Sequence, residues 1–210
     1  MATYDLTIPI SEEAVRALHV GDTVRLSGLM ATGRDAAHKY MVETFIQSPT
    51  VPESERALYE ELKRLFAGGV IYHCGPVVRQ RPNGRWEFVA AGPTTSIREE
   101  VYEPQVIAHF GLRGVIGKGG MGANTLRACQ EHGAVYLHAV GGAATLIADA
   151  VKEVVAVYKK DEFGVPEAFW VIRTENFPTV VTMDSHGRSI HDEVEALSQE
   201  ALRRLVGVKI

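Results

Sequence analysis

The residues best suited to chemistry lie in the segment Gly92-Pro93-Thr94-Thr95-Ser96-Ile97-Arg98. A strand pattern ends at Gly92-Pro93, and the hydroxyl residues that follow are typical of a helix start. The first N–H groups of a helix lack intrahelical partners and carry the positive end of its dipole, so such a junction can bind an anion. Arg98 adds a permanent cation one turn later. The segment predicts a site for a small, negatively charged ligand.

A second candidate is the glycine run Gly117-Lys118-Gly119-Gly120-Met121-Gly122. Glycines allow a ligand to approach backbone amides closely, and Lys118 stands at the end of a predicted strand. The run is not a Walker loop, because Gly119 follows the lysine, and it lacks the dinucleotide-binding spacing. By itself it is equally consistent with a tight turn and an exposed lysine. For Gly141-Gly142 we favour close packing of the Ala143-Ala144 helix on the sheet.

Arg34 and Arg98 each follow a predicted strand and open a predicted helix, where the helix dipole disfavours a cation. Guanidinium groups bind carboxylates through two parallel charge-assisted bonds. Two arginines with Lys118 would therefore suit a ligand that has two carboxylates. His38 follows Arg34 by one helical turn and either faces the same pocket or is a capped or solvent-facing side chain.

The remaining histidines and the cysteines suggest no metal centre in this chain. His73, His138, His186 and His191 show no paired metal-ligand spacing, and we assign them no role. Cys74 and Cys129 are far apart and form neither a Cys-x-x-Cys pair nor a disulfide framework, which favours a reducing compartment.

The elements that must position these residues repeat the order strand, glycine turn, helix. The order occurs at Trp86–Ala90, at Leu112–Ile116 and at Ala134–Val140, which indicates an α/β core with its sites at strand C-terminal ends. The helix after Thr94 is expected to continue through Tyr102 and to stop before Pro104, and a further helix containing Val106, Ile107 and Phe110 is expected to follow.

Other patterns complete the expected fold. Ser11 begins a short helix, and Pro82-Asn83-Gly84 is a hairpin turn. Ala37, Met41 and Phe45 are four residues apart and predict one buried helix face. The later expected elements are a helix over Ala143–Val151, strands over Phe169–Thr174 and Thr179–Asp184, and a polar helix over Ile190–Leu205.

Composition excludes several classes of protein. The chain has 210 residues, a formal net charge of -4 and 46% hydrophobic residues, which is typical of a globular chain that can bury a core. Its Lys and Arg residues do not cluster, so we expect no nucleic-acid binding. We find no apolar run of membrane-spanning length and no signal-peptide layout, and we expect a cytoplasmic protein.

The three motifs together resemble one known family. Gly33-Arg34-Asp35-Ala36-Ala37-His38, Gly92–Arg98 and Gly117–Gly122 are similar to the β subunit, or C-terminal domain, of class I fumarate hydratases and to the β subunit of L-tartrate dehydratase. The resemblance runs in order to Phe169-Trp170 and Asn176-Phe177-Pro178 and covers nearly the whole chain. It implies a swivelling-type α/β fold of layered β/β/α type over residues 1–210, with a C-terminal helix or tail at about 190–210.

The resemblance also implies a function shared between two subunits. In this family an oxygen-sensitive 4Fe-4S cluster, held by three cysteines of the α subunit, has one open iron, and two unpaired cysteines here cannot replace those ligands. The expected enzyme is a cytoplasmic heterotetramer of two α and two β chains that hydrates fumarate to (S)-malate in the tricarboxylic acid cycle. This chain would bind no cofactor or metal alone.

Residue roles are also implied by the resemblance. Arg34, Arg98 and Lys118 would bind the substrate carboxylates, and Thr94 would be the catalytic base. His38, Thr95 and Gly119 are further candidates for the site. The acid that protonates the departing hydroxyl would come from the α subunit.

One departure and three alternatives accompany this interpretation. The family commonly has Met and then an acidic residue after the second arginine, whereas this chain has Glu99-Glu100, so the former packing position is expected to be exposed or to have found a cation. Thr32-Gly33-Arg34 is closer to the fumarase pattern than to the tartrate pattern. The alternatives are tartrate or a related hydroxy-dicarboxylate as substrate, a non-catalytic phosphate- or nucleotide-binding regulatory subunit, and a structural subunit.

Overall fold

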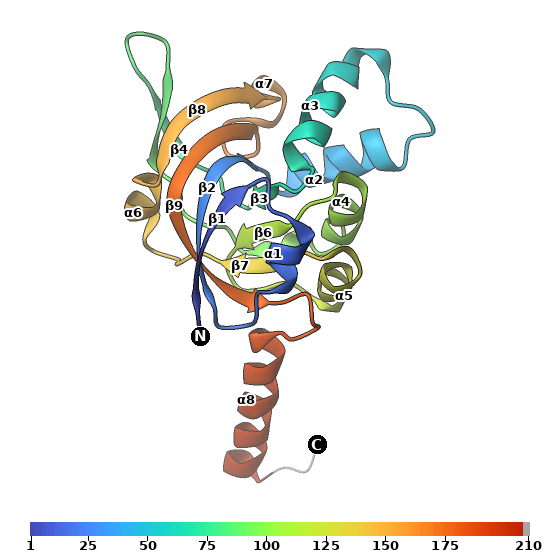
Figure 1. Cartoon of the computed structure of the whole chain (residues 1–210), viewed down its shortest axis with the longest axis vertical. Coiled ribbons are helices and arrows are strands. Elements are labelled where there is room, and N and C mark those ends of the chain that lie inside the picture. Colours follow the sequence, from blue (N-terminus) through green and yellow to red (C-terminus); the bar gives the residue numbers. More distant parts are fainter. Residues whose placement is uncertain (208–210) are drawn as a thin grey trace.

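One curved, seven-stranded sheet forms the centre of the molecule (Figure 1). The computed structural model describes residues 1–207, and residues 208–210 lie outside the described part. The strands, in their spatial order, are β1 (Thr3–Ile8), β2 (Thr23–Thr32), β3 (Val70–Tyr72), β6 (Gly114–Gly117), β7 (Val135–His138), β9 (Phe169–Met183) and β8 (Val151–Tyr158).

The sheet closes on itself through β9. Strands β2, β3, β6 and β7 pair in parallel, and β9 runs antiparallel to both β7 and β2. The pairing of β9 with β2 joins the two ends of this series, so five strands form a small barrel flanked by β1 and β8. The expected α/β class is confirmed. Because four barrel strands are parallel, their C-terminal ends lie at one edge.

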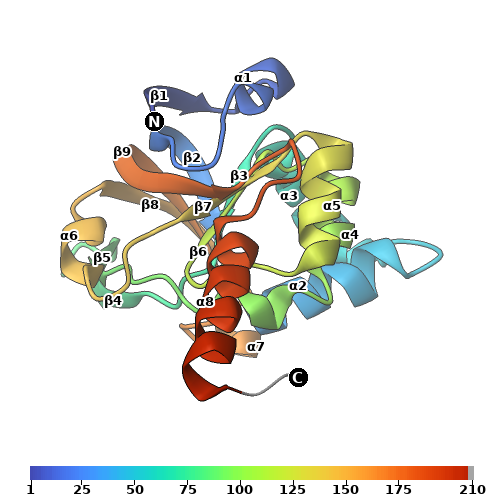
Figure 2. The same ribbon diagram turned by 90° about the horizontal axis from the view of Figure 1, so that it is seen from below.

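Side chains of the barrel strands alternate between two hydrophobic cores. Tyr72 and Ile116 belong to one cluster of buried residues, whereas their neighbours Ile71 and Val115 belong to the other. This alternation is the period of a strand that is buried on both faces. The second core also receives the helices α2 (Asp35–Met41), α3 (Arg56–Phe66), α4 (Glu103–Phe110) and α5 (Ala123–His132), which gather on one side of the barrel (Figure 2).

The expected helix face after Arg34 is confirmed. Ala37 and Met41 of α2 are buried, as is Phe45 in the π-helical turn Val42–Ile46 that continues it. The expected hairpin is also confirmed, since β4 (Val77–Gln80) and β5 (Trp86–Ala90) pair around Pro82-Asn83-Gly84. The hairpin packs on the barrel through Trp86, whose ring lies 5.4 Å from that of Trp170.

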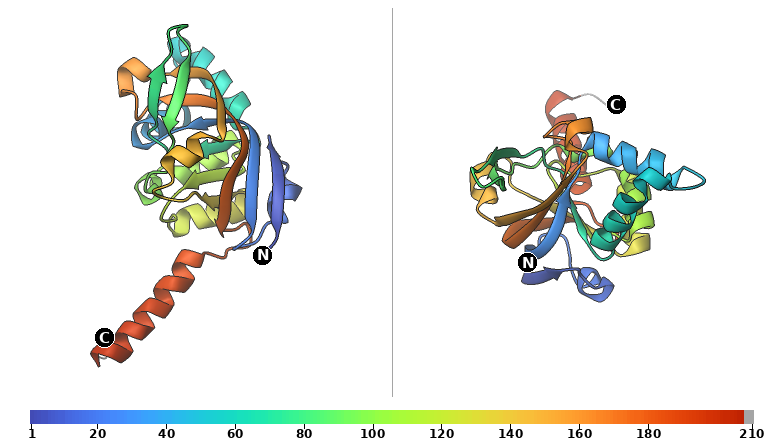
Figure 3. Two further views of the ribbon diagram at one scale, coloured as in Figure 1. Left: turned by 90° about the vertical axis from the view of Figure 1, so that its left-hand side faces the viewer. Right: turned by 90° about the horizontal axis from the view of Figure 1, so that it is seen from above.

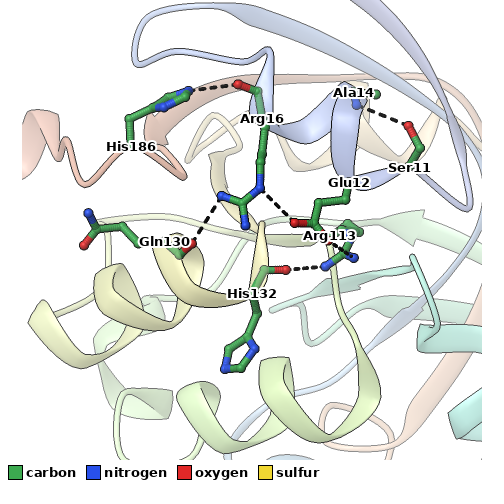
Figure 4. Close-up of polar contacts among 8 residues, drawn as sticks. All are labelled: Ser11, Glu12, Ala14, Arg16, Arg113, Gln130, His132 and His186. Atoms are coloured by element: carbon green, nitrogen blue, oxygen red, sulfur yellow. Dashed lines mark hydrogen bonds and ion pairs between the residues drawn. The ribbon is translucent and has the colours of Figure 1, made fainter.

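The short helix α1 (Glu12–Arg16) is fastened to the end of α5 by polar contacts (Figure 4). Ser11 caps α1 as expected, because its hydroxyl accepts the N–H of Ala14 at 3.2 Å. Glu12 forms ion pairs with Arg16 and Arg113, and Arg16 donates to the carbonyl of Gln130. These bonds hold the loop after β1 against the barrel.

The C-terminal helix α8 (Ile190–Val206) projects away from the barrel and has no buried residue (Figure 3). The helix expected over Ile190–Leu205 is therefore confirmed, and the tail at 208–210 falls outside the described residues. None of the helices described in residues 1–207 has both the length and the hydropathy needed to cross a membrane.

Two expectations for the C-terminal third are wrong. The helix over Ala143–Val151 is only α6 (Ala144–Ala148), and Val151 already begins β8, which the sequence analysis missed. The strands expected over Phe169–Thr174 and Thr179–Asp184 form one strand, β9. Asn176 takes a φ of 51° there, and its N–H donates to the Ser27 hydroxyl at 3.0 Å, so a bulge lets β9 continue past Pro178.

The helix expected after Thr94 and through Tyr102 is also wrong. The chain forms only a four-residue 3-10 turn, Ser96–Glu99, and α4 (Glu103–Phe110) follows it. Another short helix, α7 (Lys160–Phe163), occurs later in the chain. Pro104 lies in the first turn of α4, where a proline is tolerated because the N–H it lacks would have no helical partner. Helix α4, which begins at this turn, confirms the helix expected at Val106, Ile107 and Phe110.

Candidate active site

Two of the predicted motifs meet His73 at the C-terminal edge of the parallel strands. Gly33-Arg34 follows β2, His73 follows β3, and Lys118 follows β6. The Gly33 N–H donates to the Tyr72 carbonyl at 3.0 Å, and the His73 N–H donates to the Ile116 carbonyl at 2.8 Å. The three strand ends are therefore hydrogen-bonded to one another in sequence.

The hydroxyl segment lies between two of these strand ends. The Thr94 N–H donates to the carbonyl of His73 at 2.8 Å. The Lys118 N–H donates to the Thr94 carbonyl at 3.1 Å, and the Ser96 N–H donates to the Lys118 carbonyl at 3.1 Å. The structure thus brings Thr94 and Lys118, predicted from separate motifs, into direct backbone contact.

This pairing corrects the physical basis of the predicted anion site. The N–H groups of Thr94 and Ser96 are occupied by carbonyls, and the helix behind them is only a single 3-10 turn. Two of the amides that would have received an anion are therefore not free, and no long helix supplies a dipole. Binding of a negative ligand here must rest on side-chain cations and hydroxyls.

The Thr94 hydroxyl is one of several buried polar groups near this edge that lack a protein partner among the described residues. Among the described residues, its buried Oγ1 atom makes no hydrogen bond. Buried polar atoms are nearly always paired, so an unpaired hydroxyl at a strand edge indicates a group kept for a ligand. Thr95 is exposed beside it, and its methyl group lies near Gly119, which adopts a φ of 82°.

The three cations differ in how firmly they are held. Arg34 is half-buried and its Nη1 lies 3.3 Å from the Glu167 carboxylate. A Cβ at Gly75 would come within 2.6 Å of that nitrogen, so glycine leaves the space that the guanidinium occupies. In the described residues 1–207, no hydrogen bond or ion pair fixes the side chains of Lys118 or the exposed Arg98.

Beneath this edge lies a buried polar cluster that the sequence analysis did not assemble. We call His38, His73, Glu103, Ser96 and Tyr136 the buried relay. Glu103 Oε2 lies 2.9 Å from His38 Nε2 and 3.0 Å from His73 Nε2. His73 Nδ1 and the Tyr136 hydroxyl each lie 2.8 Å from Ser96 Oγ. All of these side chains are fully buried.

The structure therefore changes the interpretation of two histidines. His38 does not face solvent, because its Nδ1 donates to the Arg34 carbonyl at 2.8 Å and its Nε2 faces Glu103. His73, to which we assigned no role, lies at the centre of the relay. The signal for His73 was present in the sequence, since it directly follows a buried strand at the same edge as Arg34 and Lys118.

The charge state of the relay follows from its geometry. Both nitrogens of His38 face acceptors, which favours the doubly protonated imidazolium. Burial, the largest single effect, lowers the pKa of His38, but the charge and hydrogen bond of Glu103, the Arg34 carbonyl and the charge of Glu99 together outweigh burial, and the net pKa is raised. Burial likewise raises the pKa of Glu103, yet His38 and His73 together bring it down to about 2. His38 and Glu103 form a buried ion pair.

The same cluster has the donor types of a metal site. Two imidazole nitrogens and one carboxylate oxygen lie within 4.8 Å of one another in His38, His73 and Glu103. Each ring also has its second nitrogen bonded within the chain, an arrangement that metal ligands share with buried ion pairs.

Glu99 is buried beside the relay. Its side chain is 2% exposed and its Oε2 has no hydrogen-bond partner among the described residues. Burial raises the pKa of Glu99, although His73 and His38 act in the opposite direction. Of the two alternatives expected for this position, exposure is wrong, and the compensating charge comes from the nearby imidazoles together with a backbone hydrogen bond.

We expect Glu99→Met to raise the free energy of unfolding at pH 7. An unpaired buried polar atom costs about 1–3 kcal/mol, and methionine fills a similar volume without that cost. Urea denaturation measures the change. Glu100→Gln is the matched control, because Glu100 accepts the Gly122 and Thr125 N–H groups, and this variant should lose stability. A less stable Glu99→Met variant would show that Glu99 is a net partner of the imidazolium.

The two cysteines do not fit an iron-sulfur cluster. Cys74 and Cys129 are both buried, and burial raises the pKa of each thiol, to about 12 for Cys74. Cluster ligands are thiolates, usually three or four of them. With two cysteines among its 210 residues, neither poised to ionise, this sequence does not supply the ligands of such a cluster.

The fold and the site define a small α/β barrel domain with a cationic, hydroxyl-bearing edge. The chain belongs to the Fumarase C-terminus family, whose sequence model matches residues 2–194.

Individual relatives agree with this family. A Geobacillus stearothermophilus protein named "Putative fumarate hydratase class I" is 49% identical over 197 residues, which are 94% of this chain and 35% of that protein. The Methanocaldococcus jannaschii "Putative L(+)-tartrate dehydratase subunit beta" is 39% identical, covering 95% of this chain and 96% of that protein. The Escherichia coli L(+)-tartrate dehydratase subunit beta is 36% identical, with 93% and 90% covered. The chain thus spans about a third of the first relative and nearly all of the other two.

Proposed function

We propose that this chain is the β subunit of a two-subunit hydro-lyase that interconverts fumarate and (S)-malate. One observation carries the proposal. At the strand edge, the Thr94 hydroxyl has no partner among the described residues, while the Thr94 backbone carbonyl accepts a hydrogen bond from the Lys118 N–H. Arg34 and Arg98 come from the adjoining motifs. The family and the matches to tartrate dehydratase β subunits support the subunit assignment.

In this proposal the cations bind the dicarboxylate. Arg34 and Arg98 offer planar forks that match carboxylate oxygens, and Lys118 offers a compact charge. His38, Thr95 and Gly119 belong to the same three motifs, and the buried His38 acts through its hydrogen bond to the Arg34 carbonyl. The Glu167 carboxylate beside Arg34 keeps that guanidinium oriented before the substrate arrives.

Thr94 takes the proton in the malate-to-fumarate direction. An alcohol is a weak base, so the charge that develops on the threonine oxygen and on the substrate carboxylate needs stabilisation. Lys118 and Arg98 supply positive charge for it. The acid for the departing hydroxyl and the 4Fe-4S cluster are assigned to the α subunit, because this chain has no residues that fit the cluster.

The remaining parts of the proposal concern assembly. We assign residues 1–210 to one domain of the swivelling type that closes over the α subunit in a cytoplasmic heterotetramer of the tricarboxylic acid cycle. Tartrate dehydration is the second candidate, and it is favoured by the two relatives named above that match this chain over nearly their whole length.

The test is an anaerobic assay of the chain with and without a cluster-bearing α subunit. Fumarate hydration by the complex but not by the isolated chain would support the proposal. Turnover by the isolated chain would contradict an active site shared between two subunits. Comparing kcat/KM for fumarate, malate and L-tartrate decides between the two substrates. Nucleotide binding without turnover in the complex would instead favour the regulatory alternative.

Within the complex, Arg98→Ala should lower kcat/KM by about 10²-fold to 10³-fold. Truncating one partner of a charged pair typically costs 2–5 kcal/mol, and here a substrate carboxylate would lose its guanidinium. Steady-state kinetics measure the loss. Arg85→Ala, at the exposed tip of the β4–β5 hairpin, is the matched control and should keep normal kinetics. Normal activity of Arg98→Ala would remove this residue from the site.

A further inference from the structure

A single buried carboxylate joins two of the three site motifs. Glu103 Oε2 contacts the Nε2 atoms of both His38 and His73, at 2.9 and 3.0 Å. Glu103 lies in the first turn of α4, outside all three motifs. The two imidazole rings are 5.0 Å apart and meet nearly edge to face. Because all three side chains are fully buried, none can contact a ligand at the surface.

The first arm of the relay leads from Glu103 to Arg34. His38 Nδ1 donates to the Arg34 carbonyl at 2.8 Å. Arg34 is the residue that precedes α2 and has extended backbone, so this bond fixes the turn from which its guanidinium departs. The position of Arg34 therefore depends on the orientation of the His38 ring.

The second arm leads from Glu103 to Thr94. His73 Nδ1 lies 2.8 Å from Ser96 Oγ, and the His73 carbonyl accepts the Thr94 N–H at 2.8 Å. One histidine thus holds the hydroxyl segment on both sides of Thr95. The Tyr136 hydroxyl donates to the same Ser96 oxygen.

Glycine at position 117 is required by this second arm. A Cβ there would come within 1.8 Å of Ser96 Oγ and 2.9 Å of the Tyr136 hydroxyl. Strand β6, which ends immediately before Lys118, therefore has a glycine where the Ser96 bond needs space. The relay touches all three motifs, through Arg34, through Thr94 and Ser96, and through Gly117.

We propose that Glu103 and His73 are positioning residues that set the location of Thr94 relative to Arg34 without contacting substrate. The proposal rests on the proposed function for its kinetic consequences. A metal ion in the cluster is the competing explanation. The geometry favours the relay at His73, because its Nε2 is hydrogen-bonded to Glu103 Oε2 and its Nδ1 to Ser96. His38 Nε2 lies 2.9 Å from the same carboxylate oxygen as an ion-pair contact, and among the described residues neither it nor Glu103 Oε1 has an aligned hydrogen bond.

The two arms can be separated at His73. In His73→Asn the amide nitrogen takes the place of Nδ1 and can still reach Ser96, but nothing reaches Glu103. In His73→Gln the amide nitrogen takes the place of Nε2 and can still reach Glu103, but the Ser96 bond is lost. A side chain that only fills space would tolerate both changes equally.

In the complex with the α subunit, His73→Gln should lower kcat by about 10-fold to 100-fold with KM changed by less than about threefold. Misplacing a reacting group by about 1 Å can cost 10²-fold, whereas the Arg34 arm stays intact. Glu103→Gln disturbs both arms and should also raise KM. His73→Asn should lose less kcat than His73→Gln. Wild-type kcat in both His73 variants would overturn the proposal.

The matched control is Asp22→Asn at the opposite end of β2. Asp22 is a buried carboxylate that accepts the Ala2 and His19 N–H groups, so its replacement should lower stability. Asp22 lies the full length of β2 from Arg34, and kcat should be unchanged. An equal loss of kcat in Asp22→Asn would mean that stability, not positioning, controls the rate.

Two measurements on the full chain alone need no activity. Amide hydrogen exchange at Thr94 and Ser96 should accelerate at least tenfold in His73→Gln but not in Asp22→Asn, and unchanged exchange would overturn the relay. Elemental analysis of the chain should find no stoichiometric metal, and one tightly bound metal ion lost in both His73 variants would replace the relay with a metal site.

The two proposals can fail separately. If the wild-type complex hydrates nothing while amide hydrogen exchange responds to His73→Gln as expected, the proposed function is wrong and the positioning role of the relay is retained.

Discussion

If Thr94 is the base of the proposed two-subunit hydro-lyase, replacing it with valine should lower kcat of the complex by about 10²-fold to 10⁴-fold, the usual contribution of a positioned acid or base. Valine matches threonine in shape and keeps the backbone bonds of residue 94 to His73 and Lys118. The change therefore removes the unpaired Oγ1 atom and little else. KM should change by less than about threefold, because the carboxylate-binding cations remain.

Anaerobic steady-state kinetics with fumarate and malate measure this effect. Thr182→Val is the matched control, since the Thr182 hydroxyl is also buried and without a partner among the described residues, but it lies on β9. That variant should keep kcat and unfold at an equal or higher denaturant concentration. A Thr94→Val enzyme with normal kcat would assign proton removal to another group. The solvent isotope exchange of malate would then identify whether the proton step was affected at all.

The parts of the fold that the sequence predicted are those set by local chemistry. The Ser11 cap, the hairpin at Asn83-Gly84 and the buried face from Ala37 to Phe45 each depend on residues close in the chain. The strand-end placement of Arg34 and Lys118 was predictable for the same reason, because a strand followed by glycine ends at a sheet edge.

The predictions that the structure contradicts concern features that depend on contacts between distant residues. Whether Pro104 ends or begins a helix is not decided by proline, which tolerates both, but by Glu103 entering the core to meet two imidazoles. Strand β9 continues past Pro178 because β2 supplies a hydroxyl at Ser27 for the bulge. The closure of the barrel likewise required knowing that β9 pairs with both β2 and β7.

The buried relay shows the same limit at the site itself. No spacing rule connects its members in the sequence, which are His38, His73, Ser96, Glu103 and Tyr136. From the sequence, His73 had no predicted role, and His38 could either face the pocket or be a capped or solvent-facing side chain. Only the packing of α4 against the strand ends shows that these side chains share one carboxylate.

Glu103→Gln should destabilise the fold by about 3–5 kcal/mol, because removing one member of a buried ion pair leaves the other charge uncompensated. The cost should depend on pH. The pKa of Glu103 falls from 4.5 to about 2 on folding, so its contribution is full above about pH 4.5 and is lost as pH falls toward 2. The pKa of His38 is raised above 6.5, so its contribution is full below pH 6.5 and is lost as pH rises through the folded value.

Both contributions are therefore complete only between about pH 4.5 and 6.5, and the stability difference between wild type and Glu103→Gln should be largest in that window. Urea denaturation from pH 4 to 9 measures the difference. Glu55→Gln is the matched control, since Glu55 pairs with Lys159, whose pKa is raised from 10.5, and its cost should stay constant between pH 6 and 9. A Glu103→Gln deficit that is also constant from pH 5 to 9 would mean that His38 is neutral in the folded chain. In that case the relay would consist of ordinary hydrogen bonds without an ion pair at its centre.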